Sequence, residues 1–452
     1  MKIIVAGCGK IGRAITSTLT AEGHGVTVID NDPDVIGEVT NIYDVMGVCG
    51  NGADCETLEE AGIAQSDLFI AVTSSDELNM LACFLAKRMG VTHTIARIRN
   101  PEYNDNSLGF MKNELELSMA INPDLLAAEE LFDILKLPSV AKIESFSARN
   151  FKMIELVLKS GSKLAGLSLR ELREKYKSKV LICLVKRGDE VYIPDGNFVL
   201  REGDKTAITA AHEDILRFLR EIGLVHKQAR NIMIVGGSRT AFYLAKMLGA
   251  AGVNVKIVER DEKVCGELCE ALPHAVIICG DGAEQEILLE EGIRSLDAFV
   301  ALTGMDEENI LISIYATLQN VPKVISKINR EGLSKMAERL GLDTTVSPQK
   351  IIADVIARYA RAVENSKGSN VETLYKLMDD AGEALEFNAK DDPRLVRIPL
   401  RDLKLKPNTL LAGIIRKRRP IVPAGDDMIL PGDRVIVLSA TAGLHDLSDI
   451  IK

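Results

Sequence analysis

The chain repeats its own sequence, and this duplication constrains the fold more than any other feature. Residues 3–9 (IIVAGCG) correspond to residues 232–238 (IMIVGGS), and residues 67–73 (DLFIAVT) correspond to residues 297–303 (DAFVALT). The same proline–glycine and glycine–aspartate turns also recur in the last part of each copy. Two copies of about 225 residues fill the chain, so we expect no separate substrate domain.

Each copy changes its pattern partway. In the first copy, apolar runs over 2–6, 26–29, 45–49, 68–72 and 94–98 alternate with amphipathic segments, which predicts a Rossmann-type, doubly wound parallel sheet. The remainder is rich in β-type runs and turns, which predicts a small α+β domain. In the second copy, a helix is predicted over 371–378, after the polar linker 366–370. We therefore expect an α/β protein with Rossmann-type nucleotide-binding domains at 1–137 and 229–366 and small C-terminal domains at 140–223 and 371–452.

A complete G-x-G-x-x-G fingerprint directly follows the first predicted strand and precedes a helical pattern. Such glycines permit a tight turn and a close approach of the backbone to a pyrophosphate, which then sits at the positive end of the helix. The predicted nucleotide-contacting residues of this loop are Gly7, Cys8, Gly9, Lys10, Ile11 and Gly12.

An acidic residue, Asp30, follows at the end of the second predicted strand, where ribose recognition requires one. Its carboxylate can accept hydrogen bonds from both ribose hydroxyls and repels a 2′-phosphate, which favours NAD(H) over NADP(H). The alternative is a structural turn followed by a solvated acid.

Three further segments are expected to end at the same edge of the sheet, where ligands of such folds bind. They carry the candidate contacts Asn51 and Asp54, then Thr73 and Ser74, and finally Arg97 and Arg99. The two arginines alternate along a strand, so both can face a phosphate. The equally weighted alternative is an ion pair between these arginines and Asp76 or Glu77.

The second glycine loop is degenerate, because serine and alanine replace its second and third glycines. A Cβ atom at the serine position crowds the path of a pyrophosphate, so weaker or different binding is expected there. The candidate residues of this second site are Gly236, Gly237, Ser238, Arg239, Thr240, Glu259, Thr303 and Lys327.

No catalytic or metal-binding pattern accompanies these loops. None of the six histidines is expected at the carboxyl edge of a sheet, and the eight cysteines form no C-x-x-C motif. Cys49 and Cys279 occupy matching positions, which we interpret as packing of a small apolar residue. The net charge of −10 and the absence of tryptophan argue against a nucleic-acid partner. No apolar run reaches the length of a membrane span or of a signal peptide, so a cytoplasmic protein is expected.

Several segments resemble regulator-of-potassium-conductance (RCK) modules, namely IAVTSSDE at 70–77, ARIRNPEY at 96–103 and the Pro-x-Gly and Gly-Asp hairpins. The tandem arrangement is similar to that of the peripheral NAD-binding subunits of Trk potassium-uptake systems, and the similarity extends over essentially the whole chain.

The resemblance implies a regulatory subunit that is not an enzyme, and that binds NAD(H), or ATP and ADP at the same sites. It implies a homo-oligomer, a tetramer forming a ring of modules, attached to the inner face of the cell membrane beneath a potassium transporter. By the family pattern, helices over 106–115, 124–137, 333–340 and 348–364 carry the dimer and ring contacts. An NAD-dependent oxidoreductase and a nucleotide sensor for another partner remain as alternatives.

Overall fold

The computed structural model describes residues 1–100, 103, 109–111, 114–136, 142–145, 151–177, 179–224, 229–342, 344–366, 371–378, 382–417, 419–440, 444 and 446–452. The chain divides into two compact units. The first unit contains Met1–Phe132 and Ala229–Ala360, and the second contains Asp133–Gln228 and Arg361–Lys452. Each unit therefore combines a segment from the first copy of the repeat with the matching segment from the second.

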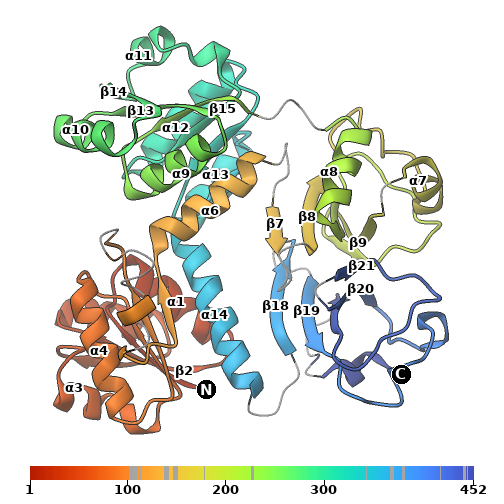
Figure 1. Cartoon of the computed structure of the whole chain (residues 1–452), viewed down its shortest axis with the longest axis horizontal. Helices are drawn as coiled ribbons and strands as arrows, with labels where there is room; N and C mark the ends of the chain where they lie inside the picture. The colour runs from red at the N-terminus through yellow and green to blue at the C-terminus, as the bar shows by residue number, and fades with distance from the viewer. Residues whose placement is uncertain are drawn as a thin grey trace. The chain divides into compact units, whose positions relative to one another are not determined.

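The first copy contributes a six-stranded parallel sheet to the first unit, in the order β3-β2-β1-β4-β5-β6. Figure 1 shows helices α1, α3 and α4 of this copy in red and orange around the sheet. The neighbouring strands β1 and β4 connect onward in opposite directions, so the loops that follow them diverge and leave a crevice at the carboxyl edge. Its elements are β1 (Lys2–Ala6), α1 (Lys10–Ala21), β2 (Gly25–Asp30), α2 (Pro33–Ile42), β3 (Met46–Cys49), α3 (Cys55–Glu60), β4 (Leu68–Ala71), α4 (Asp76–Arg88), β5 (His93–Arg97), β6 (Met119–Ile121) and α6 (Pro123–Lys136).

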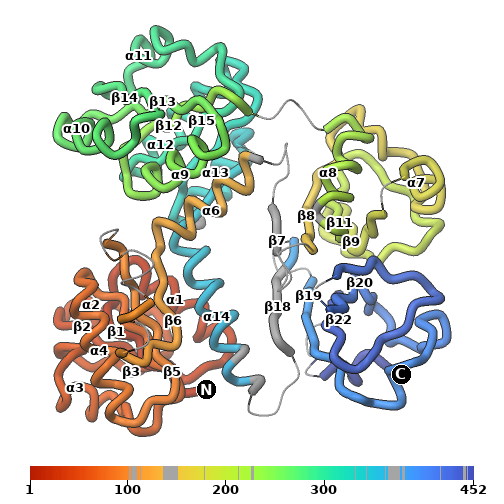
Figure 2. The backbone as a smooth tube through the Cα atoms, in the orientation of Figure 1, coloured from red at the N-terminus to blue at the C-terminus, as the bar shows by residue number. Residues whose placement is uncertain are grey.

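The second copy builds the same sheet, in the order β14-β13-β12-β15-β16-β17, and Figure 2 labels its first four strands. The two parallel sheets confirm the predicted fold class. The elements are β12 (Asn231–Val235), α9 (Arg239–Ala250), β13 (Asn254–Glu259), α10 (Glu262–Ala271), β14 (Ala275–Cys279), α11 (Gln285–Glu290), β15 (Ala298–Ala301), α12 (Asp306–Leu318), β16 (Val324–Lys327), α13 (Glu331–Arg339), β17 (Thr345–Val346) and α14 (Pro348–Ser366).

The last helix of the second copy packs against the sheet of the first copy. The buried side chains of Ile352 and Ile356 on α14 share one core with Val5 and Ile95. Close to the same core, the Nδ1 atom of His93 lies 3.0 Å from the hydroxyl of Tyr359 on α14. In Figure 1, α14 accordingly lies beside α1, and α6 lies beside α9 of the second copy. The two Rossmann-type folds are therefore joined through their last helices.

The second unit contains two five-stranded antiparallel sheets with the orders β10-β9-β11-β8-β7 and β18-β19-β22-β20-β21. Phe151 and Leu184 of the first sheet share a buried core with Ile415 and Ile436 of the second. The elements are β7 (Lys142–Ser145), β8 (Phe151–Val157), α7 (Leu169–Lys175), β9 (Leu181–Arg187), β10 (Glu190–Tyr192), β11 (Lys205–Ala211), α8 (His212–Glu221), β18 (Val371–Leu377), β19 (Gly382–Asn388), β20 (Thr409–Arg416), β21 (Arg419–Ile421) and β22 (Arg434–Ser439).

One predicted helix is wrong. Residues 371–377 form strand β18, which pairs antiparallel with β19. Its sequence VETLYKL alternates apolar and polar residues at its end and carries β-branched and aromatic residues, which favour an extended strand once a partner strand is present. The helix predicted over 106–115 lies partly outside the described residues, as does residue 137 at the end of the helix predicted over 124–137. Within the described ranges, no helix has the length and apolar character needed to cross a membrane.

Candidate functional site

The three glycines of the first glycine loop have different roles: two are required by close packing, and one leaves free space beside the backbone. Gly7 has a φ angle of +102°, and a Cβ atom there would lie 2.8 Å from the backbone nitrogen of Thr73. A Cβ atom on Gly12 would lie 1.8 Å from the carbonyl oxygen of Gly7. A Cβ atom on Gly9 would meet nothing within 4 Å. Gly7 and Gly12 are thus required by packing, whereas Gly9 leaves the backbone open toward the cavity.

Asp30 closes one side of this loop. Its carboxylate accepts hydrogen bonds from the backbone nitrogens of Cys8, at 2.6 Å, and Asp32, at 3.1 Å. The Cys8 side chain is buried, and burial together with the Asp30 charge raises the pKa of its thiol to about 12. Cys8 therefore serves the loop through its backbone, and its thiol is a core group.

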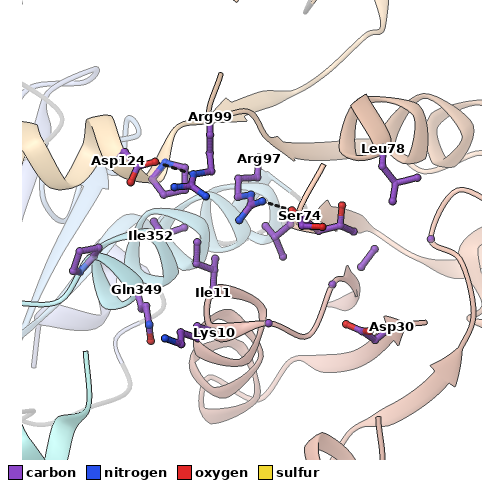
Figure 3. A pocket seen from close by; sticks show the side chains of 18 of the residues that line it. Lys10, Ile11, Asp30, Ser74, Leu78, Arg97, Arg99, Asp124, Gln349 and Ile352 are labelled. Carbon is purple, nitrogen blue, oxygen red and sulfur yellow. Dashed lines mark hydrogen bonds and ion pairs between the residues drawn. The ribbon is translucent and has the colours of Figure 1, made fainter. Parts of the chain in front are cut away.

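An open cavity of about 800 Å³ lies at the carboxyl edge of the first sheet, with residues of both copies in its wall (Figure 3). The candidate residues that line it are Gly7, Gly9, Lys10, Ile11, Asp30, Asn51, Thr73, Ser74, Arg97 and Arg99 from the first copy and Ser238, Arg239, Thr240 and Lys327 from the second. The remaining candidates, Cys8, Gly12, Asp54, Gly236, Gly237, Glu259 and Thr303, do not line this cavity.

Arg97 and Arg99 both line the cavity, but neither makes the ion pair considered as the alternative. The Arg97 guanidinium donates a hydrogen bond to the carbonyl oxygen of Thr73. The Nε atom of Arg99 lies 2.8 Å from a carboxylate oxygen of Asp124, and Figure 3 shows this pair on one wall. Asp76 instead accepts hydrogen bonds from the backbone nitrogen of Arg99, at 2.8 Å, and from that of its neighbour. Asp76, at the start of α4, therefore holds the backbone of the loop after β5 through these two hydrogen bonds.

The cavity wall carries an excess of positive charge. Five cationic side chains line it, namely Lys10, Arg97, Arg99, Arg239 and Lys327, against the carboxylates of Asp30 and Asp124. Burial, followed by the charge of Arg99, lowers the pKa of Arg97, which is only 7% exposed. Burial likewise lowers the pKa of Lys327. The Nε atom of Arg97 is also buried without a hydrogen-bond partner among the described residues. Partly buried cations of this kind favour an anionic ligand.

A buried asparagine connects the ends of β4 and β5. The Asn79 side chain is fully buried; it accepts a hydrogen bond from the Thr73 nitrogen at 2.8 Å and donates one to the Arg97 carbonyl oxygen at 3.0 Å. The second copy repeats this arrangement with Asn309, which joins Thr303 to Lys327. Sequence reasoning missed the role of this asparagine, although its identical spacing in both copies, three residues after Asp76 and Asp306, is a signal that could have found it.

The second glycine loop is held by a hydrogen bond within the loop and by close packing against α10. The hydroxyl of Ser238 accepts a hydrogen bond from the backbone nitrogen of Ala241 and caps α9. A Cβ atom on Gly237 would lie 2.9 Å from side-chain atoms of Glu259, Val264 and Leu268. The loop therefore packs tightly on α10, while the first turn of α9 faces the cavity described above.

Sequence reasoning missed several cavity residues because long-range packing brings them there. Asp124 comes from α6, Asn329 follows β16, and Gln349 and Ile352 come from α14. In Figure 3, Gln349 and Ile352 on α14 lie near Lys10 and Ile11. The cysteine interpretation is wrong, because Cys49 and Cys279 are both exposed and so do not serve as packing residues. Among the described residues, no group of three histidine, cysteine or acidic side chains could hold a metal ion.

Comparison with protein families identifies the chain. The TrkA-N domain matches residues 3–115 and 232–348, and the TrkA-C domain matches residues 153–223 and 384–452. The chain belongs to the TrkA family. It is 30% identical to a Trk system potassium uptake protein TrkA homolog of Archaeoglobus fulgidus, over 100% of both chains. It is 29% identical to the Trk system potassium uptake protein TrkA of Vibrio alginolyticus, over 97% of this chain and 93% of that protein.

Solved structures support the TrkA-type fold. The GsuK RCK domain covers 97% of this chain, which in turn covers 92% of it, with a TM-score of 0.63 at 17% sequence identity. The GsuK channel bound to NAD has a TM-score of 0.64, again at 17% identity, over 97% of this chain and 76% of that one. At this identity, the likeness concerns the fold alone.

Proposed function

We propose that this TrkA-family protein is a regulatory subunit that binds NAD(H) in the shared cavity and gates a membrane potassium-uptake transporter. In this proposal the protein is cytoplasmic and attached to the inner face of the membrane through the transporter. It acts as a homo-oligomer, a tetramer forming a ring of modules. The relatives named as Trk potassium-uptake proteins support the transporter partner, and the neighbour bound to NAD supports the choice of cofactor.

The observation that carries the proposal is the composition of the cavity wall. Asp30 lies beside the first glycine loop, where its carboxylate can accept hydrogen bonds from a ribose. Arg97 and Arg99 of the first copy, and Arg239 and Lys327 of the second, can bind phosphate oxygens. A dinucleotide in this cavity would therefore contact both copies of the repeat.

Contact with both copies gives a physical route to regulation. A ligand changes a conformational equilibrium only by the difference between its affinities for the two conformations. A shift of one fold relative to the other changes the distance from the bound nucleotide to Arg239 and Lys327. A nucleotide that contacts residues from both copies therefore binds the two conformations with different affinities. Coupling of about 1–3 kcal/mol, which is typical of allosteric proteins, would shift such an equilibrium about 5- to 150-fold.

ATP and ADP are the second candidate ligands for the same cavity. A nicotinamide riboside is uncharged in its reduced form, whereas five cations line the wall. The phosphates of a nucleoside di- or triphosphate make better use of this charge. Competition between NADH and ATP in equilibrium binding tests whether the two ligands occupy one site.

We propose that the protein is not an enzyme. Among the described residues that line the cavity, no histidine is present to act as the acid or base of a hydride-transfer step. The oxidoreductase alternative predicts consumption of NADH by the purified protein in the presence of a metabolite pool. A sensor for another partner would instead bind nucleotide but stay off membranes that contain the transporter.

We also propose that the chain divides into nucleotide-binding domains at 1–137 and 229–366 and C-terminal domains at 140–223 and 371–452. Within the second copy, we propose that Ser238, Arg239, Thr240 and Lys327 act at the shared cavity. Gly236, Gly237, Glu259 and Thr303 remain the candidates for a weaker second site.

The direct test is calorimetric titration with NADH. Replacement of Asp30 by alanine should weaken binding at least tenfold, about 1.4 kcal/mol, because the ribose loses its acceptor. The matched control is Glu259→Ala, which alters the corresponding carboxylate in the second copy and should weaken binding in the cavity much less than Asp30→Ala does. Equal affinities for wild type and Asp30→Ala would remove Asp30 from the ribose role.

A further inference from the structure

Two thiols meet at the end of the second sheet. Cys279 is the last residue of β14 and lies in register with Glu259 of β13. The Sγ atom of Cys265, on α10, lies 3.3 Å from the carbonyl oxygen of Glu259. Alternate residues of a strand point to opposite faces, and Ile278 packs in the core on the α11 and α12 side. Cys279 therefore points to the other face of the sheet, where Cys265 lies.

The chemical environment of Cys265 agrees with this geometry. Burial and then a hydrogen bond with the Cys279 thiol raise the pKa of Cys265 to about 12. Cys265 is 7% exposed, whereas Cys279 is exposed to solvent. The pair thus combines an accessible sulfur with a buried neighbour on the same face of the sheet.

The first copy lacks this pair and provides an internal comparison. Asp32 and Asp261 are the N-cap residues of α2 and α10, and their side chains accept the same hydrogen bonds in the two copies. Four residues after each cap, Ile36 in the first copy is therefore equivalent to Cys265 in the second. Cys49 occupies the position of Cys279, in register with Asp30. An exposed cysteine is therefore present in both copies, but its buried partner is present only in the second.

We propose that Cys265 and Cys279 form a reversible disulfide when the protein meets a low-molecular-weight disulfide such as glutathione disulfide. The Cys279 thiolate attacks one sulfur of the oxidant, forms a mixed disulfide and releases the first small thiol. The sulfur of Cys265 then attacks the Cys279 sulfur and expels the second small thiol. The protons of the two protein thiols leave with the two small thiols. The protein dithiol is thus oxidised to a disulfide, and the small disulfide is reduced to two thiols.

The bond would act on the second glycine loop. Val264 and Leu268 flank Cys265 on α10, and both lie 2.9 Å from the place of a Cβ atom on Gly237. A disulfide requires an S–S distance of about 2.05 Å, so its formation pulls α10 toward β14. The loop that rests on α10 leads directly to Ser238 and Arg239, which line the nucleotide cavity.

Peptide mapping of the full-length protein tests the modification. The protein is equilibrated with glutathione disulfide, free thiols are alkylated, and the cross-linked peptides are identified. A Cys265–Cys279 link is expected, and it should be absent in Cys279→Ser and retained in Cys49→Ser. Ile36→Cys should add a second link, to Cys49. A link from Cys279 to Cys269, a glutathione adduct on Cys279 without a protein disulfide, or no reaction would each overturn the assignment.

The effect on the cavity rests on the proposed function and has its own readout. Nucleotide affinity of the oxidised wild type should differ at least threefold from that of the reduced protein, and Cys279→Ser should show no difference. Unchanged affinity in a protein with the mapped disulfide would contradict the coupling. If neither redox form binds nucleotide, the proposed function fails, while the mapped disulfide stands on its own.

Discussion

The Asp124 carboxylate lies 2.8 Å from the Nε atom of Arg99 and so places an acid within the cationic wall of the cavity. Its second oxygen accepts a hydrogen bond from the Thr240 hydroxyl at 3.3 Å. Asp124 thereby joins the first copy to the first turn of α9 in the second copy. A ligand phosphate that approaches Arg99 must compete with this internal anion.

Removal of the charge at Asp124 should strengthen the binding of phosphate-rich ligands. In Asp124→Asn, we expect ADP affinity to rise about threefold and by no more than about fivefold, because roughly 1 kcal/mol or less of competing charge interaction at a partly exposed pair is lost. Adenosine, which carries no phosphate, should bind equally to both proteins. Weaker ADP binding in the variant would show that Asp124 holds the site together instead of competing for it.

Asn79 should matter for both stability and binding. Replacing Asn79 by alanine leaves the Thr73 nitrogen and the Arg97 carbonyl oxygen without their buried partner. Loss of such buried hydrogen bonds costs about 1–3 kcal/mol, measurable by urea unfolding. NADH affinity should fall as well, because the positions of Thr73 and Arg97 relax.

The matched control for this variant is Asn309→Ala, which removes the same contacts in the second copy. It should destabilise the protein to a similar extent with a smaller effect on NADH affinity. Equal losses of affinity in the two variants would contradict the larger role given to Asn79, because Asn309 positions Lys327 in the wall of the same cavity.

The second unit should owe part of its stability to a buried ion pair between β9 and the turn before β11. Arg187 donates two hydrogen bonds of 2.8 Å to Asp204, whose side chain is 1% exposed. Burial alone would raise the pKa of Asp204, but the hydrogen bonds and charge of Arg187 outweigh it and hold the pKa below its usual value. The second copy repeats the pair with Arg416 and Asp433.

Because the pKa of Asp204 is depressed in the folded protein, its ion pair contributes fully to the free energy of unfolding above the pKa of the unfolded chain, about 3.9. This contribution is lost as the pH falls through the pKa of Asp204 in the folded protein. Asp204→Asn should lower the free energy of unfolding at pH 7 by about 1–3 kcal/mol and flatten its dependence on pH below about 4. The control Asp392→Asn, in a solvent-exposed pair with Arg394, should change stability much less. An unchanged acid profile in Asp204→Asn would contradict this account.

The sequence predicts the two parallel sheets well because local patterns encode them. Buried strands such as β1 and β4 appear as continuous apolar runs, and the fingerprint at 7–12 marks the first turn. The repeat then transfers each assignment to the second copy. The error at β18 arises because a short amphipathic segment takes its conformation from its partner strand.

The shared nature of the cavity could not be predicted in the same way. Ile352 shows the periodicity of a helix that packs on some sheet, but periodicity does not say which of the two sheets. Asp124 and Gln349 reach the cavity only because α6 and α14 extend between the two copies. The sequence therefore predicts Arg239 and Lys327 at a separate second site, whereas both line the cavity at the first sheet.

Potassium uptake in a host that lacks its own copy of the subunit tests the central claim most directly. Wild type, Asp30→Ala and Glu259→Ala are supplied separately, and uptake is measured while the cellular NADH level is varied. The proposal predicts that wild type restores uptake with a response to NADH, that Glu259→Ala retains most of this response, and that Asp30→Ala loses it. Uptake that stays at the level of the empty host with wild type, although the purified protein binds nucleotide, would contradict the proposed gate.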